Sequence, residues 1–425
     1  MNLFDYLYWR ADVSLSASAF NPVDNLILAE LCYTDLAGIV PPSGEEVSLQ
    51  EARDLFFALH DREEVARRSS YTARAPFLMD SMCTGARFAD TRLCFYEAVT
   101  DKDETAQFAA VTFCLPDGTA YVAFRGTDGT VVGWKEDFIL SYRSGTKSQE
   151  RAAEYLRRVG ERLSCPLRLG GHSKGGNLAV YAASFAPPEL AEQIIQVWSN
   201  DGPGFRDEIR ALPGYRAIQS RTVSVIPDTS VIGLLLESDC VRHVVKSSAS
   251  GLAQHDGFTW EVGPVDFIPA AITRTGAYLE KTVDSWVASL DDETLHSLVD
   301  SVFTAIEATG QDTFHAMSLN KMRTAEIIMT AIRSLPREKQ RELLHATGRL
   351  VQSGGTAART LLERDEEHKQ QLDAANESAP ASERPAEESD ADWLKPAAWS
   401  SSAQCTDRPS EEWPAEEPEI LFSQE

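Results

Sequence analysis

The chain has 425 residues, of which 43% are hydrophobic, so it can form one large α/β domain with an appendage or two to three small domains. Its formal net charge of −25 argues against nucleic acid as a partner, because phosphates require a basic surface. The same charge argues against electrostatic docking on anionic lipid. Part of this acidity lies after Leu372.

The sequence carries no recognisable targeting or metal-binding pattern. Its first residues lack the basic and apolar regions of a secretory signal, and no apolar run approaches the ~18 residues of a membrane span. The seven cysteines are odd in number and lack metal-type spacing. We therefore expect free thiols, a cytoplasmic protein, and a function that requires no metal or organic cofactor.

The first 65 residues read as loops and helices, with amphipathic helices over Asn25–Leu36 and Glu51–His60. The pattern then changes to short β-type runs that alternate with helical ones. Strands are predicted over Ala109–Cys114, Ala120–Phe124, Leu167–Leu169, Ile194–Trp198 and Thr222–Ile226. The first two flank the turn 115–118 and predict a hairpin. A helix over Gln149–Leu163, with Ser148 as its N-cap, completes a pattern typical of a mostly parallel α/β sheet.

After about residue 275 the sequence is helical. An apolar stripe from Leu295 to Ile306 predicts one helix, capped by Asp291 or Asp292, and helices are also expected over 327–332 and 337–351. From about 373 the chain is rich in Glu, Ala, Ser and Pro, which is typical of disorder. The expected organisation is thus an α/β domain over 1–275, a helical appendage over 276–372 and a disordered acidic tail over 373–425. The tail contains three tryptophans that are either partner anchors or stray aromatics: Trp393, Trp399 and Trp413.

The most informative motif is Gly-x-Ser-x-Gly at Gly171, Ser173 and Gly175. An apolar strand precedes it and an Ala-rich helix follows it, which is the setting of a nucleophile elbow. There the serine hydroxyl leaves a strained turn at a helix N-terminus that can stabilise an oxyanion. The bare pattern also fits a Gly-rich turn in which Ser173 caps the helix.

A serine nucleophile needs a base, and in α/β-hydrolases the chain order is Ser, then Asp or Glu, then His. Two histidines follow Ser173 before the helical appendage. His243 lies in a strand-like run, whereas His255 lies in a loop before another β-type stretch. We therefore predict His255 as the base; the alternative is a polar loop residue bonded to its neighbours.

The orienting acid is expected directly after a core strand. Asp228 ends the strand Thr222–Ile226 and is the first choice, and Asp201, at the end of the preceding strand, is the alternative. Either residue could instead cap a turn. Asp256 adjoins His255, but neighbouring side chains diverge.

An oxyanion hole requires two N–H donors. The backbone of Lys174 provides one, and Thr127, after the strand Ala120–Phe124, provides the other, with its hydroxyl as a further donor. Arg125 is expected to be structural, ion-paired beneath this loop. The following small and apolar segment, Gly129–Trp134, is either a lid over the site or a surface loop with a buried tryptophan.

Taken together, these residues resemble the class 3, fungal-type lipases of the α/β-hydrolase fold. The resemblance covers about residues 105–260 and rests on Phe124–Thr127 followed by Trp134 and Asp137, on Gly171–Gly176, and on Asp228 with a later His255. It implies Ser173 as nucleophile, His255 as base, Asp228 as acid, and Thr127 and Lys174 as oxyanion donors.

The sequence is more similar to the bacterial Mbeg-like group of lipase-like proteins, through Met1–Leu36, Val231–Leu235 and Gln254–Asp256. The resemblance to that group does not indicate a substrate. Lys174 departs from the lipase pattern, which usually has Leu there. The ammonium of Lys174 argues against long-chain fat as the substrate. We expect it either to bind an acidic group of the substrate or to point to solvent.

Two hypotheses of different classes follow. The first is a cytoplasmic serine ester hydrolase that acts on a small acyl ester through an acyl-enzyme. The second is a catalytically idle hydrolase fold that serves as an interaction module, with the C-terminal helices or tail binding a protein partner. The intact Ser, Asp and His favour the first; a peptidase or thioesterase is the remaining alternative.

Overall fold

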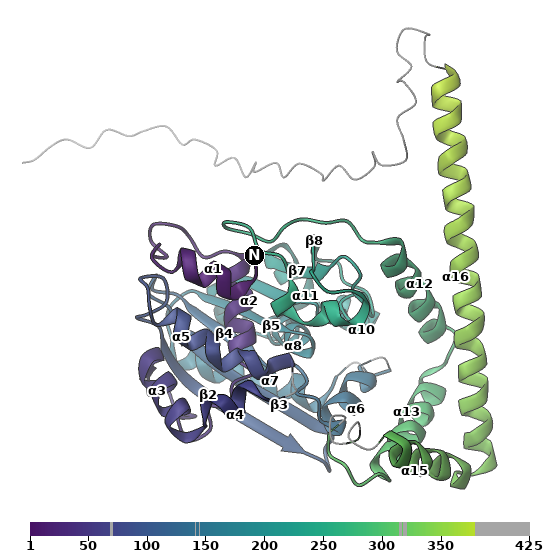
Figure 1. The fold of residues 1–425 in the computed structure, drawn as a ribbon, viewed down its shortest axis with the longest axis horizontal. Helices are drawn as coiled ribbons and strands as arrows, with labels where there is room; N and C mark the ends of the chain where they lie inside the picture. Colours follow the sequence, from purple (N-terminus) through teal and green to yellow (C-terminus); the bar gives the residue numbers. More distant parts are fainter. Residues whose placement is uncertain (69–70, 141, 144, 314–316, 318–320, 379–425) are drawn as a thin grey trace, which may run out of the picture. The chain divides into compact units, whose positions relative to one another are not determined.

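The computed structural model describes residues 1–378 except 69–70, 141, 144, 314–316 and 318–320. Its centre is an eight-stranded sheet whose strands lie side by side in sequence order (Figure 1). The strands are β1 (Val47–Ser48), β2 (Arg92–Asp101), β3 (Ala106–Cys114), β4 (Ala120–Phe124), β5 (Leu167–His172), β6 (Ile194–Asn200), β7 (Thr222–Pro227) and β8 (Val241–Val245). Strands β1 to β4 pair antiparallel, and β4 to β8 pair parallel. The structure confirms the predicted α/β class and the β3–β4 hairpin.

Strand β2 has no counterpart among the predicted strands, because a bulge interrupts its alternation of inward-facing and outward-facing residues. Its pairing with β3 shifts register between Cys94 and Glu97, and Phe95 has a positive φ of 57°. Such a bulge moves the following side chains to the opposite face of the sheet.

Two helices that flank the elbow strand cover one face of the sheet. α7 (Lys147–Arg162) packs against β3, and α8 (Lys174–Ser184) packs against β4, β5 and β6. The N-cap of α7 is Thr146, in a capping box with Gln149, and not Ser148 as predicted. Ser148 lies in the first turn of α7, and its hydroxyl is within hydrogen-bonding distance of Gln107 O and of Glu136 Oε2.

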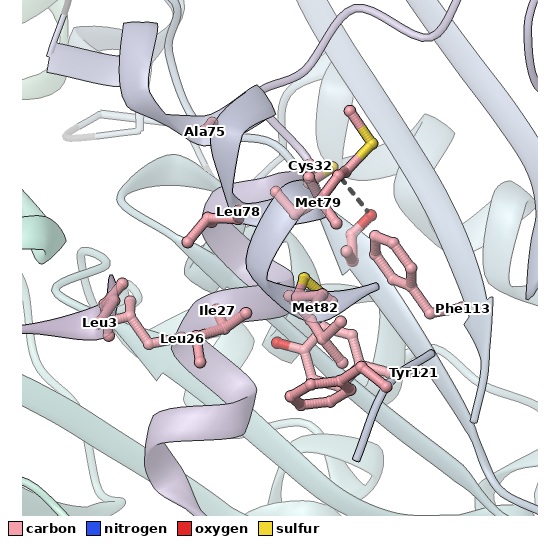
Figure 2. Close-up of a cluster of buried hydrophobic side chains, with 14 of the residues drawn as sticks. Leu3, Leu26, Ile27, Cys32, Ala75, Leu78, Met79, Met82, Phe113 and Tyr121 are labelled. Atoms are coloured by element: carbon pink, nitrogen blue, oxygen red, sulfur yellow. Dashed lines mark hydrogen bonds between the residues drawn. The ribbon is translucent and has the colours of Figure 1, made fainter. Parts of the chain in front are cut away.

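The N-terminal helices cover the opposite face. They are α1 (Leu3–Arg10), α2 (Pro22–Leu31), α3 (Leu49–Leu59), α4 (Arg62–Ala66), a 3-10 helix (Tyr71–Phe77) and α5 (Leu78–Met82). Figure 2 shows their side chains, among them Leu26, Ile27 and Met79, packed against Phe113 and Tyr121 of the sheet. Helix α2 begins before the predicted residue 25, because Asn21 and Asp24 form a capping box and Pro22 occupies its first turn.

The helical appendage consists of α12 (Arg274–Ala288), α13 (Asp292–Glu307), α15 (Lys321–Ser334) and α16 (Arg337–Ser378), drawn in green to yellow in Figure 1. Asp291 caps α13, as one of the two predicted caps. Helix α16 packs against α12 and α13 and continues past residue 372, where the tail was expected to begin. Trp393, Trp399 and Trp413 lie outside the described residues.

Shorter elements connect the strands: α6 (Val131–Ile139), α9 (Pro188–Gln193), α10 (Asp207–Arg210), α11 (Pro213–Ile218), and 3-10 helices at Gln219–Arg221, Gly251–His255 and Gly257–Thr259. Among the described residues, no helix has both the length and the apolar character needed to cross a membrane. Six cysteines are free thiols, as predicted, and Cys405 lies outside the described part of the chain.

Candidate active site

The Gly-x-Ser-x-Gly motif forms a sharp turn between β5 and α8. Ser173 has φ 59° and ψ −133°, a strained conformation for a residue with a side chain, and its side chain makes no capping bond to α8. A Cβ on Gly175 would lie 2.1 Å from Phe124 O, so the neighbouring strand leaves no room for a larger residue. The geometry is that of a nucleophile elbow and not of a helix cap.

His255 ends a 3-10 helix, and its Nδ1 lies 2.6 Å from Asp201 Oδ2. The Asp201 side chain is 1% exposed, and its other carboxylate oxygen accepts hydrogen bonds from Ser230 and from Gly233 N. Asp201 follows β6 with φ 50°, a left-handed turn that Asp tolerates better than most residues. The turn thus supplies a buried, hydrogen-bonded carboxylate behind the imidazole.

The carboxylate predicted for this position, Asp228, lies elsewhere. Its Oδ1 accepts a 2.8 Å hydrogen bond from Gln254 Nε2 and a bond from Thr229 Oγ1. The expectation was wrong because β6 and β7 are parallel neighbours that are each followed by an Asp at the same sheet edge, and strand order alone does not choose between them. Asp228 thus anchors Gln254, the residue that precedes His255.

Thr127 and Lys174, the two predicted oxyanion donors, both lie beside the elbow. Thr127 Oγ1 donates a 2.7 Å hydrogen bond to Asp137 Oδ2. Burial raises the pKa of Asp137 to about 6, while Lys174 and the Thr127 hydroxyl act in the opposite direction. Arg125 pairs with Asp128 at 3.3 Å, in keeping with the structural role expected of it.

The side chain of Lys174 contradicts both sequence-based expectations for it. It is 1% exposed, and its ammonium donates to Gln107 O, Gln107 Oε1 and Glu136 Oε2 at 2.9, 3.1 and 3.0 Å. Burial opposes ionisation of Glu136, but Lys174, Ser148 and Gln107 N together hold its pKa below the usual value. Lys174 therefore neutralises an interior carboxylate instead of facing solvent or an acidic substrate group.

A second polar layer, which sequence reasoning missed, lies behind His255. His172 Nε2 lies 2.6 Å from His255 O, and the two imidazole rings are 4.6 Å apart. Burial and the proximity of His255 keep the pKa of His172 well below its ordinary value, so it is neutral and donates through Nε2. The position of His172 immediately before Ser173 is the one sequence signal that pointed to it.

Comparison with known proteins places the chain in a family. The sequence profile of the Mbeg1-like family matches residues 82–304. The chain belongs to the Mbeg1-like family. No curated protein matches the sequence.

Two solved lipases resemble this Mbeg1-like chain in part. The M37 lipase has 14% identity and a TM-score of 0.32, over 51% of this chain and 71% of its own. The native propeptide complex of Rhizomucor miehei lipase has 13% identity and a TM-score of 0.31, over 52% of this chain and 83% of its own.

The elbow of the Mbeg1-like chain opens into a cavity of about 710 Å³. Ser173, His255 and Thr127 line it together with Trp134 of α6. Of the segment expected as a lid or a surface loop, Gly129 and the N-cap Thr130 precede α6 and the rest forms its first turn. Trp134 there is partly exposed, and α6 packs against β3 and α13. Within the residues that the structure describes, no group of three His, Cys, Asp or Glu could hold a metal ion.

Proposed function

We propose that this protein is a serine hydrolase that cleaves carboxylic esters through an acyl-enzyme. The observation that carries the proposal is a strained serine and a carboxylate-backed histidine on the wall of one cavity: Ser173 has positive φ, and His255 is bonded to buried Asp201. These are the parts of a nucleophile, a base and an orienting acid.

In this mechanism Ser173 Oγ attacks the ester carbonyl while His255 Nε2 takes its proton. Asp201 holds the Nδ1–H of the imidazole and stabilises the imidazolium that forms. The N–H groups of Lys174 and Thr127 stabilise the tetrahedral oxyanion. His255 then protonates the departing alcohol, and a water molecule, activated by the same histidine, releases the acid.

The arrangement of the loop supports this assignment. Asp201 fixes His255 through its ring, His172 fixes it through its carbonyl, and Asp228 holds the preceding Gln254. With the backbone held on both sides and the ring bonded to Asp201, the imidazole keeps one orientation, which lowers the entropy cost of proton transfer.

A fluorophosphonate probe tests the proposal, because it labels activated serines without knowledge of the substrate. We expect the wild type to be labelled and Ser173→Ala not to be. Ser184→Ala is the matched control, because Ser184 is buried in the same helix but donates to Val180 O. A folded wild type that resists both this probe and a smaller sulfonyl fluoride would overturn the proposal, and so would labelling that survives Ser173→Ala.

A further inference from the structure

The walls of the catalytic cavity suggest a substrate class. We infer that helices α12, α13 and α16 form an acyl-binding subsite, and that the substrate is a single-chain ester with a non-anionic head group that enters as an individual molecule. This inference rests on the proposed function and specifies its substrate.

The appendage contributes a large share of the cavity wall. Ser173 and His255 lie on the side formed by the α/β domain, and the other side is built by apolar residues of the three helices. These include Trp286, Leu290, Leu295, Val299, Phe303 and Leu350. An acyl chain bound at the serine would therefore run between the two parts of the chain.

This wall is fixed to the α/β domain on two sides. Along α6, Val131 N donates to Asp312 O at 2.9 Å, and the Phe138 and Phe303 rings lie 5.8 Å apart. On the other side, the guanidinium of Arg206 makes a two-point ion pair with Asp292, at 2.9 and 3.1 Å. These contacts hold α13 in place, so this wall of the cavity has a defined position.

The chemistry of the cavity favours an apolar chain. Its volume of about 710 Å³ lies within the range of small-molecule sites, and its walls are mainly aliphatic and aromatic. Burial of one methylene group strengthens binding about fourfold. Longer acyl groups should therefore react faster until the cavity is filled.

The charges around the cavity disfavour an anionic head group and an anionic lipid surface. Glu237 and Asp284 line it, and Arg206 is paired with the carboxylates of Asp292 and Glu208. The formal charge of −25 adds a repulsive field. The same charges would help to expel the carboxylate product after hydrolysis.

A pair of adjacent residues on α16 provides the test. Leu350 lines the cavity, whereas Val351 is 73% exposed. The activity of wild type, Leu350→Trp and Val351→Trp would be measured on p-nitrophenyl esters from acetate to dodecanoate below their micelle concentrations, and the wild type would also be followed as the dodecanoate concentration is raised through that value. We expect Leu350→Trp to lower kcat/KM for dodecanoate relative to acetate by about sixteenfold, the effect of roughly two methylene groups, and Val351→Trp to leave the profile unchanged.

Binding without turnover gives an independent readout. Ser173→Ala would be titrated calorimetrically with 1-monolauroylglycerol and with sodium laurate, and we expect 1-monolauroylglycerol to bind more tightly than laurate. Adding Leu350→Trp to Ser173→Ala should weaken the binding of 1-monolauroylglycerol. An unchanged chain-length profile in Leu350→Trp would overturn the acyl-binding subsite. The proposed function would still stand in that case, provided that ester hydrolysis depends on Ser173. A jump in rate on crossing the micelle concentration, or tighter binding of laurate, would overturn the single-molecule, non-anionic substrate. Absence of probe labelling would overturn the proposed function itself.

Discussion

The Nδ1 atom of His255 lies 2.6 Å from Oδ2 of Asp201, although the two residues are 54 positions apart in sequence. The carboxylate belongs to the turn after β6, and the histidine comes from a loop beyond β8. The pairing distinguishes two aspartates that lie at the same edge of the parallel sheet.

Substitution of each aspartate should therefore have a different effect. In Asp201→Asn the charge that stabilises the imidazolium is lost, and we expect kcat/KM to fall by on the order of 10³ to 10⁴. Asp228→Asn is the control, because the asparagine carbonyl can still accept the bond from Gln254 Nε2. Ester hydrolysis by the two variants would be compared after both are shown to be folded. A larger loss in Asp228→Asn would contradict the assignment of Asp201.

The hydroxyl of Thr127 can be tested apart from its N–H group. Thr127→Val removes the hydroxyl and its 2.7 Å bond to Asp137 but keeps the backbone donor. The bond to Asp137 holds the turn that carries the Thr127 N–H, so we expect its loss to lower kcat by up to about 10² to 10³, the cost of one misplaced oxyanion donor, with a smaller change in KM. Thr127→Ser should restore most of the activity. Equal activity of the Val and Ser variants would mean that the bond between Thr127 and Asp137 does not position the backbone N–H.

The elbow was predictable from sequence because its motif and the strand-turn-helix pattern around it form one continuous stretch of the chain. Gly171 and Gly175 are required by backbone contacts with β4 and the following turn, and the strand-turn-helix pattern surrounds them. His255 was chosen by chain order and loop context, and the structure places it in the same cavity wall as Ser173. These signals do not depend on which distant residues meet in the fold.

The partners of Asp201 and Lys174 were not predictable in this way. Whether Asp201 or Asp228 faces His255 depends on the left-handed turn at Asp201, which a sequence pattern does not specify. The side chain of Lys174 is buried only because Glu136, on a separate helix, meets it. Both outcomes are set by tertiary contacts and not by local propensity.

The buried pair of Lys174 and Glu136 should couple strongly in folding. Lys174→Met leaves the carboxylates of Glu136 and Asp137 inside the protein without their counter-ion, and we expect a loss of about 3–5 kcal/mol in the free energy of unfolding. The double variant Lys174→Met/Glu136→Gln should recover much of this loss. Urea unfolding of the two single variants and the double variant would measure the coupling. Additive effects would show that the pair is not coupled.

Glu30 should make the stability of the protein decrease as the pH rises. It is fully buried, 3.8 Å from His172 Nδ1, and burial together with nearby Asp256 raises its pKa well above the ordinary value of 4.5. The folded state therefore keeps a proton that the unfolded chain releases above pH 4.5. The stabilising contribution is complete below that pH and is lost as the pH rises toward the folded-state pKa, by up to about 1.4 kcal/mol per pH unit.

Glu30→Gln removes this titration, so its free energy of unfolding should exceed that of wild type by more at pH 8 than at pH 5. Denaturant unfolding at the two pH values would measure the difference. Glu189→Gln, on the exposed surface of α9, is the control for loss of a carboxylate. An equal effect of Glu30→Gln at both pH values would mean that Glu30 is already ionised in the folded protein, with His172 or Arg74 as its counter-charge.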